Sequence, residues 1–211
     1  MVSVPVLVLR DKTAIPDSTA IAKWAAAHSN RKLIIPPEDE LNKIITIADK
    51  VMNAGRFRVS TRCGEVGVID DQDIPPPLRI LPGFIKSFTS KFIYSYLTSK
   101  YSSAGWTVES CLQDMKTGLT ELNELRKANG GKFMVGNSLT FADIVTASAL
   151  ANLSPLPNGF SRTGPKLSKY WFERELAEEF KDFVAWRDQL YLDYRGEFKQ
   201  VDGRAGMTSR M

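Results

Sequence analysis

The side chains that most often carry chemistry are scarce in this sequence. The chain of 211 residues has two cysteines, Cys63 and Cys111, and a single histidine, His28. The cysteines stand far apart and form no CxxC pair, whereas a zinc site needs about four ligands at close spacing. A Ser-His-Asp arrangement would have to use His28, and nothing near it supports that role. We therefore expect no metal site, and the catalytic residue stays unknown.

Asp17 and Ser18 form the first polar pair with a position suited to binding. They follow Pro16 and precede the apolar positions Ile21 and Trp24 at helical spacing, which is typical of a helix start. The N–H groups and the dipole of a helix N-terminus favour a carboxylate ligand. Simple capping of the helix by Asp17 or Ser18 explains the same pattern, and the residues alone leave both interpretations open.

A second polar pair, Thr140 and Asp143, lies within the segment Leu139-Thr140-Phe141-Ala142-Asp143-Ile144. The spacing predicts a structural capping box in which each side chain meets the other residue's backbone N–H. Leu139 and Ile144 flank the box as a predicted hydrophobic staple. Such a cap typically stabilises a helix by about 1 kcal/mol. An ordinary capped helix without further function is the plain alternative.

The elements that must position these pairs begin with a strand at residues 4–9, a turn and a brief strand at 14–15. A helix over residues 18–28 follows. Pro36-Pro37 opens a helix whose apolar positions have helical spacing, and Gly55 is its predicted terminator. Residues 56–75 show no clear period, so we expect them to be irregular, with Cys63 between helices.

Three further helices are predicted, over residues 82–101, 107–128 and 176–194. The first carries an aromatic residue at every fourth position, which favours a buried stripe: Phe84, Phe88, Phe92 and Tyr96. Because residues 74–108 contain basic residues and no acid, a partner or ligand surface is the alternative. Cys111 is expected in the core of the second helix, and the polar tail after Gly196 is expected to be flexible.

The composition excludes several classes of protein. Hydrophobic residues make up 43% and charged residues 25%, as in globular proteins rather than disordered or collagen-like chains. With Lys and Arg at 28 and Asp and Glu at 24, the net charge of 28 − 24 = +4 comes with no basic block that would indicate nucleic-acid binding. No apolar run reaches the roughly 18 residues of a membrane span, and no signal peptide is recognised. Cytoplasmic residence is the expectation.

The order of these motifs resembles the glutathione S-transferase superfamily. The matching segments are Val4-Pro5-Val6-Leu7, then Asp17-Ser18-Thr19-Ala20-Ile21, then Gly136-Asn137-Ser138-Leu139-Thr140-Phe141-Ala142-Asp143-Ile144, and finally residues 180–188. The resemblance implies a mostly α fold in which a partial thioredoxin-like β-hairpin and helix, residues 1–29, precede a helical C-terminal domain. That domain is expected over residues 36–196 and a flexible tail over 197–211.

The resemblance also implies a glutathione site. The backbone of Val4, before Pro5 (a cis-proline in the family), would pair with the cysteinyl part of glutathione. Asp17 and Ser18 would hold its γ-glutamyl end. Glutathione would act as substrate with a hydrophobic electrophile, and no metal is implied. The family's catalytic Tyr, Ser or Cys lies in a β-α-β unit before the cis-proline strand, and this sequence starts at the third strand.

Three functional alternatives therefore stay open: a glutathione S-transferase that conjugates an electrophile if a complete site forms, a non-catalytic binding or scaffold protein, and a fragment or wrong start of a full-length transferase.

The strand at residues 4–9 would also present an apolar edge with unpaired backbone groups, which proteins rarely leave open. We expect a homodimer or a partner protein to close it.

Overall fold

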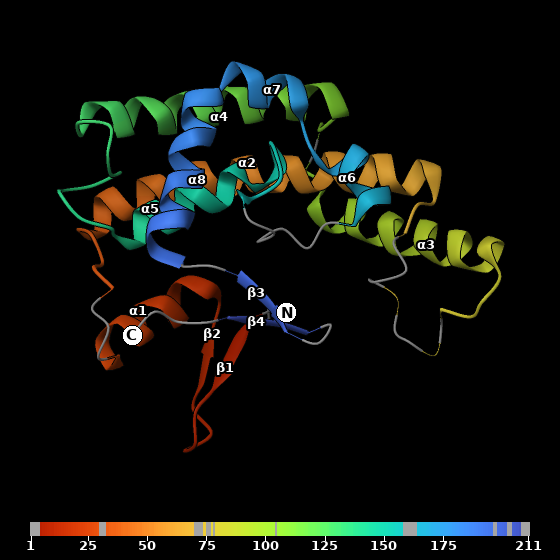
Figure 1. Cartoon of the computed structure of the whole chain (residues 1–211), viewed down its shortest axis with the longest axis horizontal. Helices are drawn as coiled ribbons and strands as arrows, with labels where there is room; N and C mark the ends of the chain where they lie inside the picture. Colours follow the sequence, from red (N-terminus) through yellow and green to blue (C-terminus); the bar gives the residue numbers. More distant parts are fainter. Residues whose placement is uncertain are drawn as a thin grey trace.

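The computed structural model describes residues 5–29, 33–69, 74, 77, 79–103, 105–157, 164–195, 198–201 and 204–207. It begins with an antiparallel hairpin of β1 (Val6–Val8) and β2 (Ala14–Pro16), in which Leu7 lies opposite Ile15. Helix α1 (Ser18–His28) follows. Most of the remaining described chain is helical (Figure 1), which confirms the predicted mostly α fold class.

Helix α2 (Glu38–Val66) includes residues 56–66 of the segment 56–75 that was predicted to be irregular, so the prediction was wrong for those residues. Residues 67–69 are outside any helix. Gly55 does not end the helix. Instead Gly67 does, with a left-handed φ of 69° and an N–H bond of 2.8 Å to the carbonyl of Cys63. Three acidic residues in the first turn, Glu38, Asp39 and Glu40, complement the helix dipole. Cys63 therefore lies within this helix, where it is buried.

Helices α3 (Gly83–Tyr101) and α4 (Val108–Ala128) occur where the sequence predicts them. Both pack extensively on α2, which is the central helix of the domain (Figure 1). A capping box starts α4, because Thr107 and Ser110 each bond the other's backbone N–H, at 2.9 and 3.1 Å. Cys111 is buried in α4, as expected.

The C-terminal part consists of shorter elements. Helix α5 (Phe141–Ala149) continues into the 3-10 turn η3 (Leu150–Asn152), and α6 (Pro165–Trp171) follows. The predicted helix over 176–194 is interrupted at Phe180, so α7 (Arg174–Glu179) and α8 (Lys181–Arg195) are separate. Beyond them, β3 (Phe198–Val201) pairs antiparallel with β4 (Arg204–Met207) in the segment predicted to be a flexible tail.

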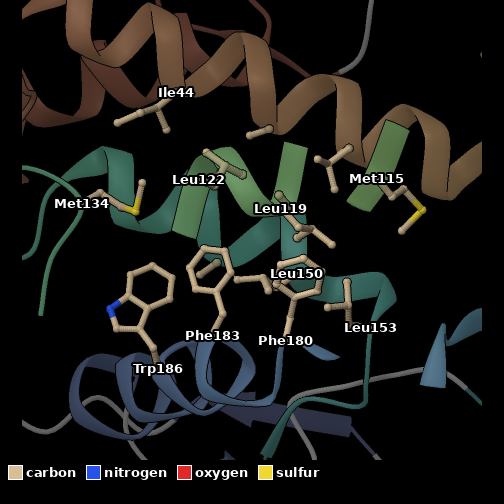
Figure 2. Close-up of a cluster of buried hydrophobic side chains, with 14 of the residues drawn as sticks. Ile44, Met115, Leu119, Leu122, Met134, Leu150, Leu153, Phe180, Phe183 and Trp186 are labelled. Atoms are coloured by element: carbon tan, nitrogen blue, oxygen red, sulfur yellow. The ribbon is translucent and has the colours of Figure 1, made fainter. Parts of the chain in front are cut away.

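The main hydrophobic core lies where α2, α4, α5 and α8 meet. Figure 2 shows Leu119 and Leu122 of α4 between Ile44 above and Phe183 and Trp186 below. The indole N–H of Trp186 reaches the carbonyl of Lys132 at 2.8 Å, so this large side chain is buried without an unpaired donor.

The aromatic stripe of α3 is not part of this core, and the predicted burial was wrong. Phe84, Phe88, Phe92 and Tyr96 are all exposed. The opposite face of α3 packs on α2. There Ser90 donates to the carbonyl of Val68 at 2.7 Å, and Tyr94 packs beside the buried Cys63.

Helix α1 and the segment after it contact the later helices. Lys23 of α1 pairs with Glu38 of α2 at 2.9 Å, and Ala22 packs against the main core. Ile34 forms a parallel bridge with Thr140, reinforced by a bond of 2.9 Å from the Phe141 N–H to the Ile34 carbonyl. The segment after α1 is thereby fixed at the N-terminal end of α5.

Candidate functional site

Asp17 occupies the junction between β2 and α1 in a strained backbone conformation. Its φ is 57° and its ψ 159°, a region that side chains other than glycine rarely adopt. The residue is the N-cap of α1, and its Oδ1 accepts the Ala20 N–H at 2.8 Å. Such strain costs about 1–3 kcal/mol and clusters at binding sites, where the surrounding structure maintains it. The capping predicted for this pair is present, and the strain is an additional feature.

Ser18 is exposed as the first residue of α1. Within the described residues, its hydroxyl and the backbone N–H groups of Ser18 and Thr19 have no hydrogen-bond partner. These groups point from a helix N-terminus, which favours an anionic ligand. The exposed Asp17 carboxylate uses one oxygen for the cap, and its other oxygen bonds no described residue. Hydrogen-bond donors that can bind an anion therefore lie beside a carboxylate that can bind a cation.

Pro5 is brought to the same place by the hairpin. Because Val6 pairs with Pro16, extending the antiparallel register by one residue sets Pro5 opposite Asp17. Pro5 is exposed, as are Asp17 and Ser18. Val4, the fourth residue of the predicted glutathione site, lies outside the described residues. Three of the four predicted residues thus lie at the open end of the hairpin, and all three are exposed.

Thr140 and Asp143 lie at the N-terminal end of α5. They form a capping box in which the Thr140 N–H and hydroxyl both donate to Asp143 Oδ2 at 2.7 Å. The other carboxylate oxygen accepts the Met134 N–H, also at 2.7 Å, and the Asp143 side chain is fully buried. The box therefore connects α5 to the preceding loop as well as capping the helix.

A cavity of about 400 Å³ opens beside this capping box. Its walls come from α5, the segment just before it, and α8, and they are mostly apolar. The first two contribute Leu139, Ile144 and Ala147, and α8 contributes Leu190 together with the aromatic and cationic side chains Tyr191, Tyr194 and Arg195. Leu139 and Ile144, predicted as a hydrophobic staple, line this cavity, and Ile144 is partly exposed to it. The shape and polarity suit an apolar organic molecule.

Neither cysteine is placed for nucleophilic chemistry. Both thiols are fully buried. Burial raises the pKa of Cys63, against smaller opposite effects from a hydrogen bond with Tyr94 and the charge of Arg62. Burial, with the nearby Asp114, raises the pKa of Cys111 to about 11. A thiol with a raised pKa forms little of the reactive thiolate at neutral pH.

His28 has a structural role at the end of α1. Its Nδ1 lies 2.8 Å from the carbonyl oxygen of Trp24, and its ring stacks on the Trp24 indole with centroids 4.5 Å apart. Within the described ranges, no group of three or more His, Cys, Asp or Glu side chains could hold a metal ion. None of the helices in the described part of the chain is long and apolar enough to cross a membrane.

Two features were missed at the level of sequence. The first is a buried cluster in which Glu173, before α7, pairs with Arg58 and Arg62 of α2. The helical spacing of Arg58, Val59, Arg62 and Cys63 indicates that the helix continues beyond Gly55, and this pattern could have predicted that the two arginines lie on one face. The second is the cavity, because its walls come from segments about 50 residues apart.

Comparison with known protein families matches residues 89–186 to the C-terminal domain of glutathione S-transferases. The matched segment begins within α3 and ends within α8, so it includes α4, α5 and the capping box. No curated protein sequence matches the chain significantly.

Proposed function

We propose that this chain, a glutathione S-transferase-like protein by its C-terminal domain, binds glutathione at the start of α1 and serves in its conjugation to an electrophile. The single observation that carries the proposal is Asp17. It is an exposed carboxylate held at a strained positive φ, opposite Pro5 and beside the Ser18 and Thr19 amides, which bond no described residue. Backbone strain of this kind clusters at active sites and ligand-binding sites.

The γ-glutamyl end of glutathione carries an α-carboxylate and an α-ammonium group, and the site offers a complement to each. The Ser18 hydroxyl and the first-turn N–H groups would donate to the carboxylate. The second oxygen of Asp17 would accept from the ammonium group. The backbone of Val4, before Pro5, is the proposed partner of the cysteinyl peptide group.

The reaction proposed is attack of the glutathione sulfur on an electrophilic carbon. The thiol S–H bond breaks and a C–S bond forms. In a substitution the carbon releases its leaving group with the bonding electron pair, and in an addition to a double bond the π electrons move to the neighbouring atom, which takes up a proton. The group that stabilises the thiolate is unassigned, and the raised pKa values of Cys63 and Cys111 give neither cysteine this role. The apolar cavity between α5 and α8 is the proposed site of a hydrophobic electrophile or ligand. The proposed compartment is the cytoplasm, where glutathione is kept reduced.

A second association is proposed at β1. In its two-stranded sheet, β1 has β2 on one side only, and among the described strands none pairs with its other edge. A homodimer or a partner protein is the proposed cover. The Leu9 N–H bonds the Thr13 carbonyl within the hairpin, so the alternation of an antiparallel ladder leaves the N–H groups of Val6 and Val8 on the open edge. Slow amide exchange at Val6 and Val8 in the purified protein supports closure, and rapid exchange at both contradicts it.

Calorimetric titration with glutathione tests the binding site. The matched pair of variants is Asp17→Asn and Ser18→Ala. Asparagine caps a helix about as well as aspartate, so Asp17→Asn removes the charge and retains the cap. Loss of a hydrogen bond to a charged group costs about 1.5–3 kcal/mol, so each variant should bind roughly 10-fold more weakly or worse.

An analogue of glutathione without the α-amino group separates the two roles. It should bind wild-type protein and Asp17→Asn equally, yet still lose affinity with Ser18→Ala. Absence of glutathione binding in the wild-type protein rejects the site.

A non-catalytic binding or scaffold protein is the second candidate, and the exposed aromatic stripe of α3 favours it. A transferase assay on protein shown to bind glutathione separates the two. Turnover of a model aromatic electrophile supports the enzyme, whereas binding without turnover across electrophile classes supports the scaffold.

A further inference from the structure

Four aromatic side chains of α3 are exposed along one face of the helix. Their exposed fractions are 75% for Phe84, 76% for Phe88, 72% for Phe92 and 63% for Tyr96. Positions four apart in a helix drift by only about 40° per step, so the rings form one aromatic stripe roughly 18 Å long. Ile80, just before α3, is a further apolar side chain with 87% exposure.

Burial within the protein does not explain the apolar character of α3. Of the residues of this helix only Ser90 is buried, and among the described elements only α2 packs extensively on it. Figure 1 shows α3 at the periphery of the helical domain. Four aromatic side chains of about 150–250 Å² each, roughly three-quarters exposed, present roughly 400–700 Å² of mostly apolar surface. Patches of this size mark interaction surfaces.

The segment around α3 has the same charge excess as the whole protein. Residues 74–108 contain four basic residues and no acidic one, and the net charge of the entire chain is also +4, so the remaining residues are balanced. From the helical angle of about 100° per residue, Lys91 lies beside the stripe on one side and Lys100 on the other. Both lysines are exposed. The face therefore combines an apolar centre with positively charged flanks.

A polar groove borders the Lys91 side of the same face, between α2 and α3. Its volume is about 500 Å³. Hydroxyl groups and one ammonium group line it, from Ser60, Thr61, Ser95, Thr98, Ser99, Ser102 and Lys91. Hydroxyl and ammonium groups donate hydrogen bonds to phosphate oxygens. An apolar stripe and a groove suited to phosphate thus lie next to each other.

A lipid surface complements this face better than a protein does. Protein interfaces are depleted in lysine, and a second copy of α3 would bring one basic flank against another. The boundary between lipid headgroups and acyl chains instead accepts aromatic side chains with basic residues beside them. Anionic headgroups attract lysines near the membrane surface.

We propose that α3 binds the protein to an anionic membrane surface. The helix lies parallel to the bilayer, and the rings of the aromatic stripe enter the headgroup–acyl boundary to a depth of about 5–10 Å. Lys91 and Lys100 stay at the level of the lipid phosphates, with the polar groove beside them. The inference stands on α3 and its groove with α2, and it is independent of the glutathione proposal.

Cosedimentation of the purified protein with phospholipid vesicles tests the proposal. Vesicles of phosphatidylcholine with phosphatidylserine are compared with vesicles of phosphatidylcholine alone. The wild-type protein should bind the anionic vesicles at least about 10-fold more tightly, because two or more lysines contribute. Raising NaCl from about 50 mM to about 500 mM should weaken that binding, since the Debye length falls from roughly 14 Å to roughly 4 Å.

Substitutions in the stripe separate insertion from charge attraction. Phe88→Ser/Phe92→Ser should weaken binding to the anionic vesicles at least about 10-fold, because it removes half of the inserted apolar area and leaves the charge unchanged. Leu192→Ser/Tyr194→Ser is the matched control, since it removes two exposed apolar side chains from α8 and should leave vesicle binding unchanged. Urea midpoints establish that each variant is folded.

Charge reversal on the flanks gives a second comparison. Lys91→Glu/Lys100→Glu should weaken binding to the anionic vesicles roughly 30-fold or more, since each lysine near such a surface contributes about a factor of 5. Lys127→Glu/Arg174→Glu changes the net charge by the same amount at exposed positions of α4 and α7. This control should retain most of the wild-type binding, because the effect of a charge decays within a Debye length.

Fluorescence provides a direct readout of insertion. A tryptophan introduced by Phe92→Trp should be quenched by vesicles whose acyl chains carry bromine, because its ring enters the bilayer boundary. Leu192→Trp, on the exposed part of α8, is the control and should show no additional quenching over wild type.

Three results overturn the proposal. One is the absence of binding to either kind of vesicle at low salt. Another is binding that Phe88→Ser/Phe92→Ser leaves unchanged, which assigns it to charge without insertion of the stripe. The third is a wild-type protein that ignores vesicles but forms a dimer in sedimentation equilibrium, dissociated by the same substitutions. That outcome assigns the stripe to a protein interface.

Discussion

Arg58 and Glu173 form a bidentate ion pair inside the protein, with Nε to Oε1 at 2.9 Å and Nη2 to Oε2 at 3.1 Å. Both side chains are less than a tenth exposed. Arg62 also donates to the same carboxylate, and Arg58 reaches the carbonyl of Val108. One carboxylate thus joins two turns of α2 to the start of α7.

Removing that carboxylate should be severely destabilising. Glu173→Ala leaves two guanidinium groups without their counter-charge, and breaking a buried ion pair costs about 3–5 kcal/mol. The control is Glu179→Ala, which breaks the exposed pair of Lys116 with Glu179 and should cost less than about 1 kcal/mol. Urea unfolding measures both. Equal losses in the two variants would contradict a special role for burial.

The two capping boxes provide a second comparison, because their motifs are alike and their surroundings differ. Asp143 is fully buried and accepts from Thr140 and Met134, whereas Thr107 and Ser110 form an exposed box. We expect Thr107→Ala to cost about 1 kcal/mol, the usual value of a cap. Asp143→Ala should cost roughly 2–4 kcal/mol, since it leaves two buried N–H groups unpaired. Thermal or urea denaturation measures the difference, and similar losses would show that burial adds nothing.

The sequence predicted most helices because their apolar positions recur at helical spacing and their ends carry recognisable caps. It failed at Gly55, where glycine suggested a terminus. A β-carbon there would approach Asn152 Oδ1 to 2.9 Å, so this glycine permits close packing of α2 against η3 and does not end the helix. Only the tertiary structure contains that information.

At α3 the sequence predicted the helix correctly but the burial of its aromatic face wrongly. Regular spacing of Phe84, Phe88, Phe92 and Tyr96 identifies one face of a helix, yet periodicity alone does not reveal what covers the face. Likewise, the Asp17-Ser18 pair was predictable as a helix start, whereas the positive φ of Asp17 and the placement of Pro5 opposite it depend on the hairpin register.

The strain at Asp17 can be tested against that at Lys12, the other described residue besides glycine with a positive φ, 69°. Lys12→Gly in the β1–β2 turn should stabilise the protein by about 0.5–1 kcal/mol, because glycine adopts this conformation without strain. Asp17→Gly should be neutral or slightly stabilising, since glycine loses only a few tenths of a kcal/mol as an N-cap. Its glutathione affinity should nevertheless fall at least 10-fold, because the carboxylate and its charge-assisted bond to the ammonium group are gone.

Stability and calorimetric titration of both glycine variants provide the measurements. If Asp17→Gly binds glutathione as tightly as Lys12→Gly does, the strained carboxylate has no part in the site.

The buried thiol of Cys111 predicts a stability change at alkaline pH. Its pKa is raised in the folded protein to about 11 from an ordinary value of 9.0. The folded state therefore retains the thiol proton where the unfolded chain loses it. The stabilising contribution is complete below pH 9 and declines as the pH rises from about 9 to about 11.

Cys111→Ala removes this titration and should flatten the loss of stability between pH 9 and pH 11 relative to wild type. Because alanine also leaves a small cavity, its stability at pH 7 should be lower by about 1 kcal/mol, and the comparison uses the slope with pH rather than the absolute value. Urea unfolding at intervals across this range measures the slope.

In the native wild-type protein at pH 8, a disulfide reagent should modify neither Cys63 nor Cys111 until urea unfolds the chain, since both thiols are buried with raised pKa values. Rapid modification of either thiol under native conditions, or an unchanged slope in Cys111→Ala, would show that burial does not control these groups.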